Sequence, residues 1–161
     1  MKHTVELEGR SMIALQKTLA NRESYKPLLL MADEDEAMLN RYIQQGDLYE
    51  VRIAEDIIGV ALFIPVDEQT IELKNIALRQ TYRGQGIAKE MIFQAETLFK
   101  RDGYIRMTVG TANSSINNIA LYQKMGFRLY EVKRDFFNTY KKTIVEHGIQ
   151  AHDLWMFEKA L

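Results

Sequence analysis

The spacing of apolar residues changes near Leu48, and this change divides the sequence into two parts. Upstream, apolar residues recur every three or four positions, which is typical of amphipathic helices. Downstream they alternate with polar residues, as in strands that bury one face. The first upstream stretch, predicted as a short helix, contains Met12, Ile13, Leu15 and Leu19.

A second helix is predicted from Asp33 to Gly46. Asp33 and Glu36 have capping-box spacing, and apolar residues follow with helical periodicity at Met38, Leu39, Tyr42 and Ile43. The four consecutive acids of residues 33–36 are also compatible with a cation site. Acids in a first helical turn oppose the helix dipole, so we interpret them as helix-stabilising residues that face water.

The downstream part predicts alternating strands and helices. A hairpin turns at Glu55-Asp56, and the helix predicted after the third strand carries its apolar face on Ile87, Met91, Ala95 and Leu98. Gly126 stands in the usual position beyond a helix end. This order indicates a mixed α/β sheet. The predicted strands are 48–54, 57–64, 70–78, 104–109, 127–133 and 151–158, and the predicted helices are 86–100 and 115–124.

Length and composition favour one globular domain. The chain has 161 residues, 47% hydrophobic and 27% charged, without an internal repeat or a Pro/Gly/Ser linker. Its formal net charge is −1, from 21 basic and 22 acidic side chains. Such a balance provides no global field to attract nucleic acid or an anionic membrane.

The absence of cysteine excludes several chemistries at once. Disulfides, thiolate metal sites and a cysteine nucleophile are ruled out, and His3, His147 and His152 share no metal-ligand spacing. His147-Gly148 is predicted as a turn. The polar N-terminus does not resemble a secretory signal, and the longest uncharged apolar run, Ile57–Val66, is about half of the roughly 20 residues that span a bilayer. We therefore expect a cytoplasmic protein.

A glycine-containing loop, Arg83-Gly84-Gln85-Gly86, lies between a predicted strand and the long predicted helix. Free main-chain N–H groups at a helix N-terminus attract anions, and glycine lets a phosphate approach without a Cβ in its path. Arg83 adds a positive charge. Taken alone, two glycines are equally compatible with an ordinary strand-to-helix turn.

Two other phosphate-binding motifs do not fit this loop. A P-loop requires Gly-x-x-x-x-Gly-Lys-Ser/Thr, which the sequence lacks. A dinucleotide-binding fingerprint needs a small residue where Lys89 stands, and it normally opens the first βαβ unit of a domain. This loop follows three predicted strands instead.

The loop and its surroundings resemble the signature of the GCN5-related N-acetyltransferase (GNAT) family. The family pattern Arg/Gln-x-x-Gly-x-Gly/Ala is met by Arg83, Gly86 and Ala88, directly after the strand 71–78. Further along, residues 120–127 (ALYQKMGF) are similar to the second hallmark of the family, an Ala-x-Tyr helix closing on Gly-Phe. The two motifs occur in the family's order and spacing.

The resemblance extends over residues 48–132 and is closest to small bacterial members of the family. Those members carry Asn-Ser-Ser before the tyrosine helix and Asp-Phe-Phe after the next strand, as at residues 113–115 and 135–137. It implies a fold of the α/β class for a single domain of residues 1–161. That fold has a mixed, mostly antiparallel twisted sheet with flanking helices.

The resemblance also implies a cofactor, acetyl-coenzyme A (acetyl-CoA). Its pantetheine arm would lie where the strand before the loop splays from the next parallel strand, and the main-chain N–H groups of residues 84–88 would hold its pyrophosphate. Relatives often carry Asn seven residues before the tyrosine, where this chain has Ser115, so Asn113, Ser115 and Asn118 are alternatives for a further contact. The implied cofactor-binding residues are Ile76, Ala77, Leu78, Arg83, Gly84, Gln85, Gly86, Ile87, Ala88, Asn113, Ser115, Tyr122 and Lys124.

Acetyl transfer to an amine sets two chemical requirements. An alkyl amine has a pKa of about 10 and must lose a proton before it attacks. A thiolate whose thiol has a pKa of about 8.5 departs more easily when it is protonated. Since the chain has no cysteine, direct attack on the thioester is simpler than a covalent acyl-enzyme.

Tyr122 and Glu72 are the predicted catalytic residues. Tyr122 matches the family tyrosine beside the thioester sulfur and is the candidate acid, with packing against Ile119 and Phe127 as the alternative. Glu72 stands eleven residues before Arg83, where some members carry a glutamate that deprotonates the amine. It is the candidate base, with ordered water or a solvated strand-edge residue as alternatives.

The acceptor is predicted to be a small primary amine. An aromatic cage would suit an amine, although the same side chains could fill the core or a dimer contact. The alternatives are acetylation of a protein terminus or lysine, and a non-catalytic acyl-CoA-binding module. The apolar C-terminal strand makes a homodimer a reasonable expectation. The candidate cage residues are Phe136, Phe137, Tyr140 and Trp155.

Overall fold

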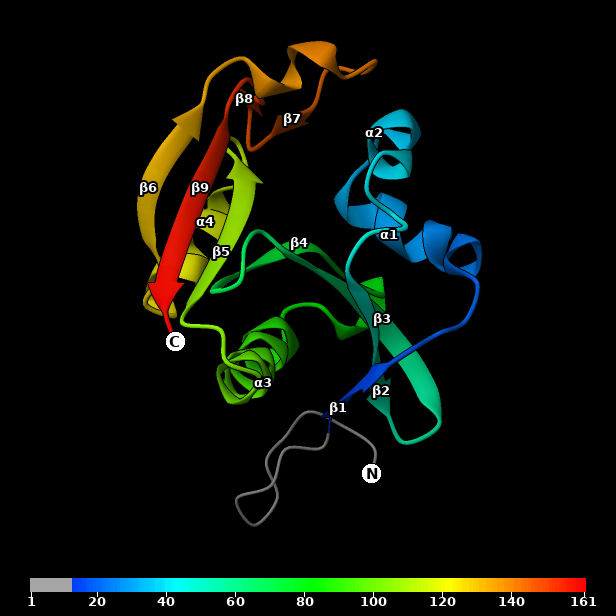
Figure 1. The fold of residues 1–161 in the computed structure, drawn as a ribbon. Coiled ribbons are helices and arrows are strands. Elements are labelled where there is room, and N and C mark those ends of the chain that lie inside the picture. Colours follow the sequence, from blue (N-terminus) through cyan, green and yellow to red (C-terminus); the bar gives the residue numbers. More distant parts are fainter. Residues whose placement is uncertain (1–12) are drawn as a thin grey trace.

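A computed structural model describes residues 13–161 and shows a seven-stranded sheet in the order β1-β2-β3-β4-β5-β9-β6 (Figure 1). Neighbouring strands are antiparallel except β4 and β5, which are parallel. The predicted mixed, mostly antiparallel sheet is confirmed. The strands are β1 (Ile13–Lys17), β2 (Asp47–Ile53), β3 (Asp56–Pro65), β4 (Thr70–Leu78), β5 (Arg106–Ala112), β6 (Arg128–Lys133), β7 (Val145–Glu146), β8 (Ile149–Gln150) and β9 (Leu154–Ala160), and the helices are α1 (Lys26–Ala32), α2 (Glu36–Asn40), α3 (Ile87–Arg101) and α4 (Ile116–Lys124).

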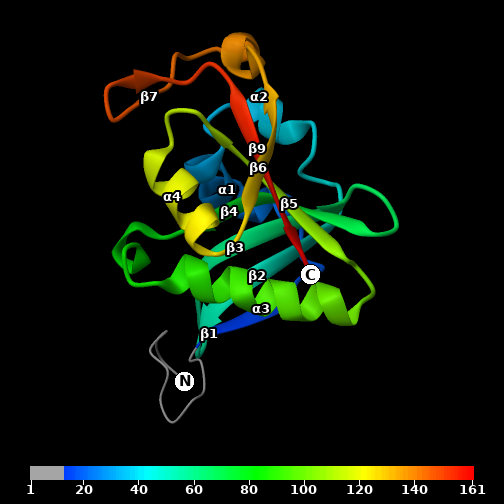
Figure 2. The same ribbon diagram turned by 90° about the vertical axis from the view of Figure 1, so that its left-hand side faces the viewer.

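Helices cover both faces of the sheet, and each face has its own hydrophobic core (Figures 1 and 2). On one face α3 and α4 bury Met91, Phe99 and Tyr122 against inward-pointing strand residues. On the other face α1 and α2 bury Leu29 and Leu39 against β3 and β4. Strand residues alternate between the two cores because successive side chains point to opposite sides.

The N-terminal quarter departs from its predicted structure. Ile13, Leu15 and Leu19 were assigned to a helix, but Ile13–Lys17 forms β1 and pairs antiparallel with β2. Met12 lies outside the described residues. Edge pairing with β2 satisfies the main chain of these residues, so this tertiary contact outweighs a short helical pattern.

The second predicted helix begins later and ends earlier than Asp33 to Gly46. Asp35, not Asp33, caps α2 by accepting a hydrogen bond from the Met38 N–H at 3.1 Å. The helix closes at Asn40, and a separate helix, α1, precedes Asp33. The predicted capping residue, Asp33, therefore lies two residues before the residue that caps the helix, Asp35.

The remaining predictions of secondary structure hold with small shifts at element ends. The third strand is confirmed without change as β4, and the tyrosine helix as α4. Gly126 closes that helix with a φ of 93°, and His147 and Gly148 form the predicted turn between β7 and β8. Ile105 is an exception: it lies within the predicted strand 104–109, but it precedes β5 and is exposed.

The fold creates an opening between β4 and β5. The two strands pair only from Thr70 opposite Arg106 to Leu73 opposite Val109. Directly beyond this pairing β4 carries a β-bulge at Lys74. Leu73 pairs with Phe63 of β3 and Asn75 pairs with the adjacent Leu62, so Lys74 between them has no partner. Residues 75–78 are consequently paired with β3 alone.

Candidate active site

The opened edge of β4 offers main-chain groups to a ligand. Ile76, Ala77 and Leu78 pair with β3 on one side, while no strand within residues 13–161 pairs with their other edge. A strand edge of this kind binds an extended amide-containing chain by main-chain hydrogen bonds. The predicted splay of the two parallel strands is therefore present, at the residues expected to meet pantetheine.

The loop after β4 has the geometry of an anion cradle. Gly84 and Gly86 adopt φ angles of 74° and 78°, which residues with a Cβ rarely take. A Cβ built at either glycine would meet nothing within 4 Å, so open space lies over the loop. Gly86 caps α3 without a side-chain hydrogen bond, which leaves the N–H groups of Ile87 and Ala88 available.

Two side chains brace this loop. The Arg83 Nε donates to the Leu78 carbonyl at 3.1 Å, and the Gln85 side-chain amide donates to the Thr81 carbonyl at 2.9 Å. Arg83 is otherwise exposed. The loop thus presents main-chain N–H groups and one cation, the combination that a diphosphate requires.

Tyr122 is buried in the core between the sheet and α3, at 3% exposure. Its ring packs against Phe127 and Phe157, with centroid distances of 5.9 and 6.1 Å. The hydroxyl donates to no residue within the described part of the chain, and burial raises the pKa of Tyr122 above its ordinary value.

Glu72 lies on the opposite face of the sheet from Tyr122. Its neighbours Ile71 and Leu73 point into the α3 core, so alternation places Glu72 toward α1 and α2. Its side chain is 20% exposed and lies 4.0 Å from the Lys74 ammonium, which stands 5.0 Å from the ring centre of Tyr42. The two predicted catalytic residues therefore lie on opposite faces of the sheet.

The Asn-Ser-Ser segment is engaged within the protein. The Asn113 side-chain oxygen accepts hydrogen bonds from the main-chain N–H groups of His152 and Asp153, and its nitrogen donates to the Gln150 carbonyl. The hydroxyls of Ser114 and Ser115 both donate to Glu146. These bonds tie β7 and β8 to the start of α4, so a cofactor contact from Asn113 or Ser115 stays a prediction.

Two other predicted cofactor residues lie at the ends of α4. The Asn118 side chain is 3.4 Å from the Thr111 hydroxyl, near the helix start. Lys124 is exposed in the last turn. A cofactor contact from Asn118 or Lys124 therefore stays a prediction.

The candidate aromatic cage divides into two groups. Phe136, Phe137 and Tyr140 contact one another, with ring centroids 4.8–6.1 Å apart. Trp155 lies on β9, opposite Thr111, and packs against the α3-side core instead. Three of the four predicted residues are therefore brought together, and one is not.

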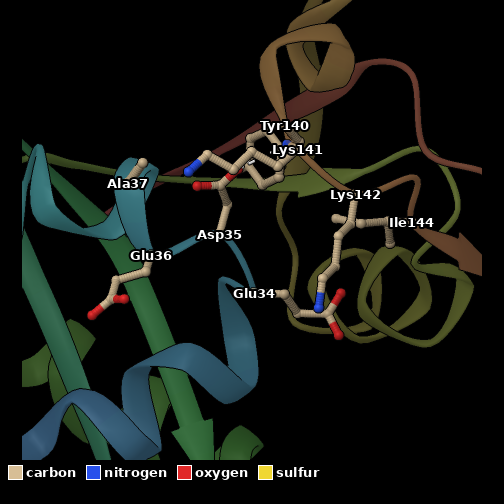
Figure 3. Close-up of a pocket in the computed structure, with 8 residues that line it drawn as sticks. All are labelled: Glu34, Asp35, Glu36, Ala37, Tyr140, Lys141, Lys142 and Ile144. Atoms are coloured by element: carbon tan, nitrogen blue, oxygen red, sulfur yellow. Dashed lines mark hydrogen bonds between the residues drawn. The ribbon is translucent and has the colours of Figure 1, made fainter.

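Sequence reasoning missed the contact between residues 140–144 and the linker from α1 to α2. Tyr140, Lys141, Lys142 and Ile144 line a cavity of about 200 Å³ together with residues 34–37 (Figure 3). Half of the acidic run does not face water: Asp35 is buried, and Asp33 accepts hydrogen bonds from two tyrosines. The pairing of residues about a hundred positions apart leaves no local sequence signal.

A sheet that opens between two parallel strands, above a glycine cradle at a helix start, defines the class of acyl-CoA-dependent acyltransferases. The acetyltransferase (GNAT) family model matches residues 16–127, and the chain belongs to this family. Membership confirms the predictions of an N-acetyltransferase enzyme and of acetyl-CoA as its acyl donor. Within residues 13–161, no helix is long and apolar enough to cross a membrane.

Individual relatives agree with this assignment. The uncharacterised N-acetyltransferase YvbK of Bacillus subtilis (strain 168) is 35% identical over 135 residues, 83% of this chain and 86% of its own length. A GNAT family acetyltransferase from Elizabethkingia anophelis with acetyl-CoA bound superposes with a TM-score of 0.88 at 31% identity, covering 94% of this chain and 100% of that one. An IAA acetyltransferase from Bacillus cereus ATCC 14579 gives 0.84 at 33% identity, covering 92% and 99%.

Proposed function

We propose that the protein transfers the acetyl group of acetyl-CoA to the primary amine of a small molecule by direct attack on the thioester. The observation that carries this proposal is the opening between β4 and β5, with Tyr122 on one face and Glu72 on the other. Donor and acceptor can then meet in the opening from opposite sides of the sheet. Cytoplasmic location, a single domain and a homodimer stay predictions.

The cofactor would be held mainly by the main chain. The free edge of Ile76–Leu78 would pair with the pantetheine amides, and the N–H groups of residues 84–88 would bind the diphosphate, with Arg83 beside it. When bound, acetyl-CoA supplies an acetyl carbonyl activated by a thiol leaving group. Such a main-chain grip leaves the side chains around the opening free for the acceptor.

Glu72 and Tyr122 would then move the two protons of the reaction. Glu72, as the base, takes a proton from the ammonium of the acceptor, directly or through water, so that the nitrogen lone pair can attack the acetyl carbon. The new C–N bond forms as the C–S bond breaks. Tyr122 keeps its proton through the neutral range because burial raises its pKa. It donates that proton to the departing sulfur, and the second proton of the attacking nitrogen passes through water to restore the hydroxyl.

The preference for a small acceptor is supported by the side of the sheet that α1 and α2 cover, called the acceptor face below. Here residues 140–144 contact the linker between α1 and α2: the Tyr140 hydroxyl donates to Asp33 and the Lys141 N–H donates to Asp35. A cavity of about 200 Å³ remains beside this contact. An extended peptide would need an open groove at this place, which the contact closes.

Two measurements on the purified protein test the proposal. Calorimetry with acetyl-CoA should show saturable binding, and thiol release should depend on both acetyl-CoA and a primary amine from a panel of alkyl amines, aryl amines and polyamines. Binding without turnover on any amine or peptide would support a non-catalytic module. Turnover only on peptides would replace the small acceptor by a protein.

A further inference from the structure

The carboxylate of Asp33 joins two segments that lie far apart in the chain. Its Oδ2 accepts a hydrogen bond from the Tyr42 hydroxyl at 2.7 Å, and its Oδ1 accepts one from the Tyr140 hydroxyl at 3.0 Å. Tyr42 follows α2, whereas Tyr140 belongs to the segment between β6 and β7. One carboxylate therefore satisfies a tyrosine from each side of the acceptor face.

A second carboxylate reinforces this junction. The Asp35 Oδ1 caps α2 through the Met38 N–H, and its Oδ2 accepts the main-chain N–H of Lys141 at 3.0 Å. These two bonds, led by the one from Lys141, lower the pKa of Asp35 below its ordinary value. Asp33, Asp35, Tyr140 and the main chain of Lys141 are called the acceptor clasp below.

The two tyrosines that bind Asp33, Tyr42 and Tyr140, remain hydrogen-bond donors across the neutral range. Burial, followed by the negative charge of Asp33, raises the pKa of Tyr42 and of Tyr140 above the ordinary value. Each therefore keeps the proton that it donates to the carboxylate. Hydroxyl-to-carboxylate bonds of this kind are among the stronger hydrogen bonds in proteins.

The clasp is connected to the strand that carries the candidate base. The Tyr42 hydroxyl accepts a hydrogen bond at 3.2 Å from Asn75, which follows the bulge in β4. The ring of Tyr42 also supports the Lys74 ammonium, which is the ionic neighbour of Glu72. Asp33 thus orients Tyr42, the aromatic surface against which the β4 side chains of the acceptor face pack.

The clasp also shapes the cavity beside it. Tyr140, Lys141 and Asp35 are among the residues that line the cavity, so the bond from the Lys141 N–H to Asp35 joins two of its walls (Figure 3). If Tyr140 lost its bond to Asp33, the wall formed by residues 140–144 would be held at this end by the Lys141 bond alone. The width of the acceptor site therefore depends on Asp33.

We propose that Asp33 is a positioning residue for acceptor specificity: by holding Tyr42 and Tyr140 it fixes the wall of the acceptor site against the linker from α1 to α2. The inference rests on the proposed function, because it assigns the acceptor to this face of the sheet. Asp33 does not touch the reacting atoms, and it acts through the two tyrosines. Acetyl-CoA binding on the opposite side of the opening is independent of it.

Kinetic measurements on five variants test this role, with phenethylamine and 1,4-diaminobutane as probe acceptors. Tyr140→Phe should raise the acceptor KM about five-fold or more, since one charge-assisted hydrogen bond is lost, while the acetyl-CoA KM stays within about two-fold. Asp33→Ala should have the largest effect. Asp33→Asn keeps an acceptor oxygen for one tyrosine and should lie between Asp33→Ala and the unmodified protein.

Tyr25→Phe is the matched control. Tyr25 also donates its hydroxyl to a carboxylate, that of Glu50, but neither residue belongs to the clasp or lines the cavity. This variant should lose stability without changing the acceptor KM. The double variant Asp33→Ala/Tyr140→Phe should be no worse than Asp33→Ala alone, because both remove the same bond.

Trypsin cleavage after Lys141 and Lys142 tests the clasp without any acceptor. Tyr140→Phe and Asp33→Ala should be cut several-fold faster there than the unmodified protein, whereas Tyr25→Phe should not. Unchanged cleavage with unchanged acceptor KM would refute the inference, as would equal rises in the KM of both substrates. If the unmodified protein acetylates neither probe, the proposed small-amine function fails, and the cleavage rates alone decide whether the clasp exists.

Discussion

At the scale of single residues, the candidate site combines Tyr122, which is buried, with Glu72, whose carboxylate is partly buried. Tyr122 has no hydrogen-bond partner within residues 13–161, although it is 3% exposed. Glu72 lies where β4 begins to separate from β5 and has an ionic neighbour in Lys74. Tyr122 suits donation of a proton and Glu72 suits acceptance of one. Mutation of each residue can separate these roles.

Tyr122→Phe should lower kcat about ten-fold or more while the affinity for acetyl-CoA barely changes, as expected for an interaction made in the transition state. The variant should fold, because the lost hydroxyl makes no hydrogen bond within the described chain and the ring contacts with Phe127 and Phe157 remain. Steady-state kinetics with a thiol-release readout measures this. Equal turnover of variant and unmodified protein would remove Tyr122 from the mechanism.

Glu72→Gln should change the acidic limb of the pH–rate profile, because a glutamine cannot take the proton of the acceptor. The expected result is a lower kcat/KM at neutral pH that recovers as the pH approaches the pKa of the free amine, about 10. Rates from pH 5 to 10 at saturating acetyl-CoA give this profile. An acidic limb identical to that of the unmodified protein would assign the deprotonation to another group or to water.

At the scale of elements, the end of β4 and the start of α3 form one binding unit. The bulge at Lys74 turns β4 away from β5, and the two glycines then return the chain into α3 with its first N–H groups exposed. The unit depends on main-chain geometry more than on side chains. Its most sensitive positions are therefore those whose backbone conformation excludes a Cβ.

Gly86→Ala should weaken acetyl-CoA binding about ten-fold or more, because a Cβ at a φ of 78° strains the loop and stands where the diphosphate approaches. Calorimetry with acetyl-CoA measures the effect. Gly103→Ala is the control: its φ is 99°, a Cβ there also meets nothing within 4 Å, and it lies in the turn after α3. Comparable losses of affinity in both variants would attribute the effect to general strain.

At the scale of the whole molecule, the sheet separates a donor side from an acceptor side. The core under α3 and α4 contains Tyr122, and the core under α1 and α2 contains Tyr42. Buried tyrosines thus stabilise both halves, and burial raises the pKa of each. Tyr140, at the clasp between the two segments of the acceptor face, behaves in the same way.

These raised pKa values predict a loss of stability in alkali. Below the ordinary tyrosine pKa of about 10, folded and unfolded chains are equally protonated and the contribution to stability is complete. As pH rises above about 10 the unfolded chain ionises first, so the free energy of unfolding should fall. Urea unfolding from pH 8 to 11.5, with absorbance at 295 nm as a tyrosinate monitor, tests this. Tyrosinate formation well before unfolding would contradict it.

The fold class, the cradle and the tyrosine helix could be predicted from the sequence alone, because their signals are local. These signals are the alternation over 70–78, the two glycines before a helix, and the motif closing on Gly126-Phe127. The helix predicted around Ile13–Lys17 is wrong, because pairing with β2 decides the structure of this segment. The sequence also predicted the helix cap at Asp33, whereas Asp35 is the cap.

Only the tertiary structure decided how the acceptor face is built. Asp33 and Tyr140 are 107 positions apart, and no periodicity or turn signal relates residues at that distance. The same holds for Glu146, which accepts hydrogen bonds from Ser114 and Ser115. Local patterns reflect hydrogen bonding within an element, whereas contacts between distant segments depend on how the complete sheet brings them together.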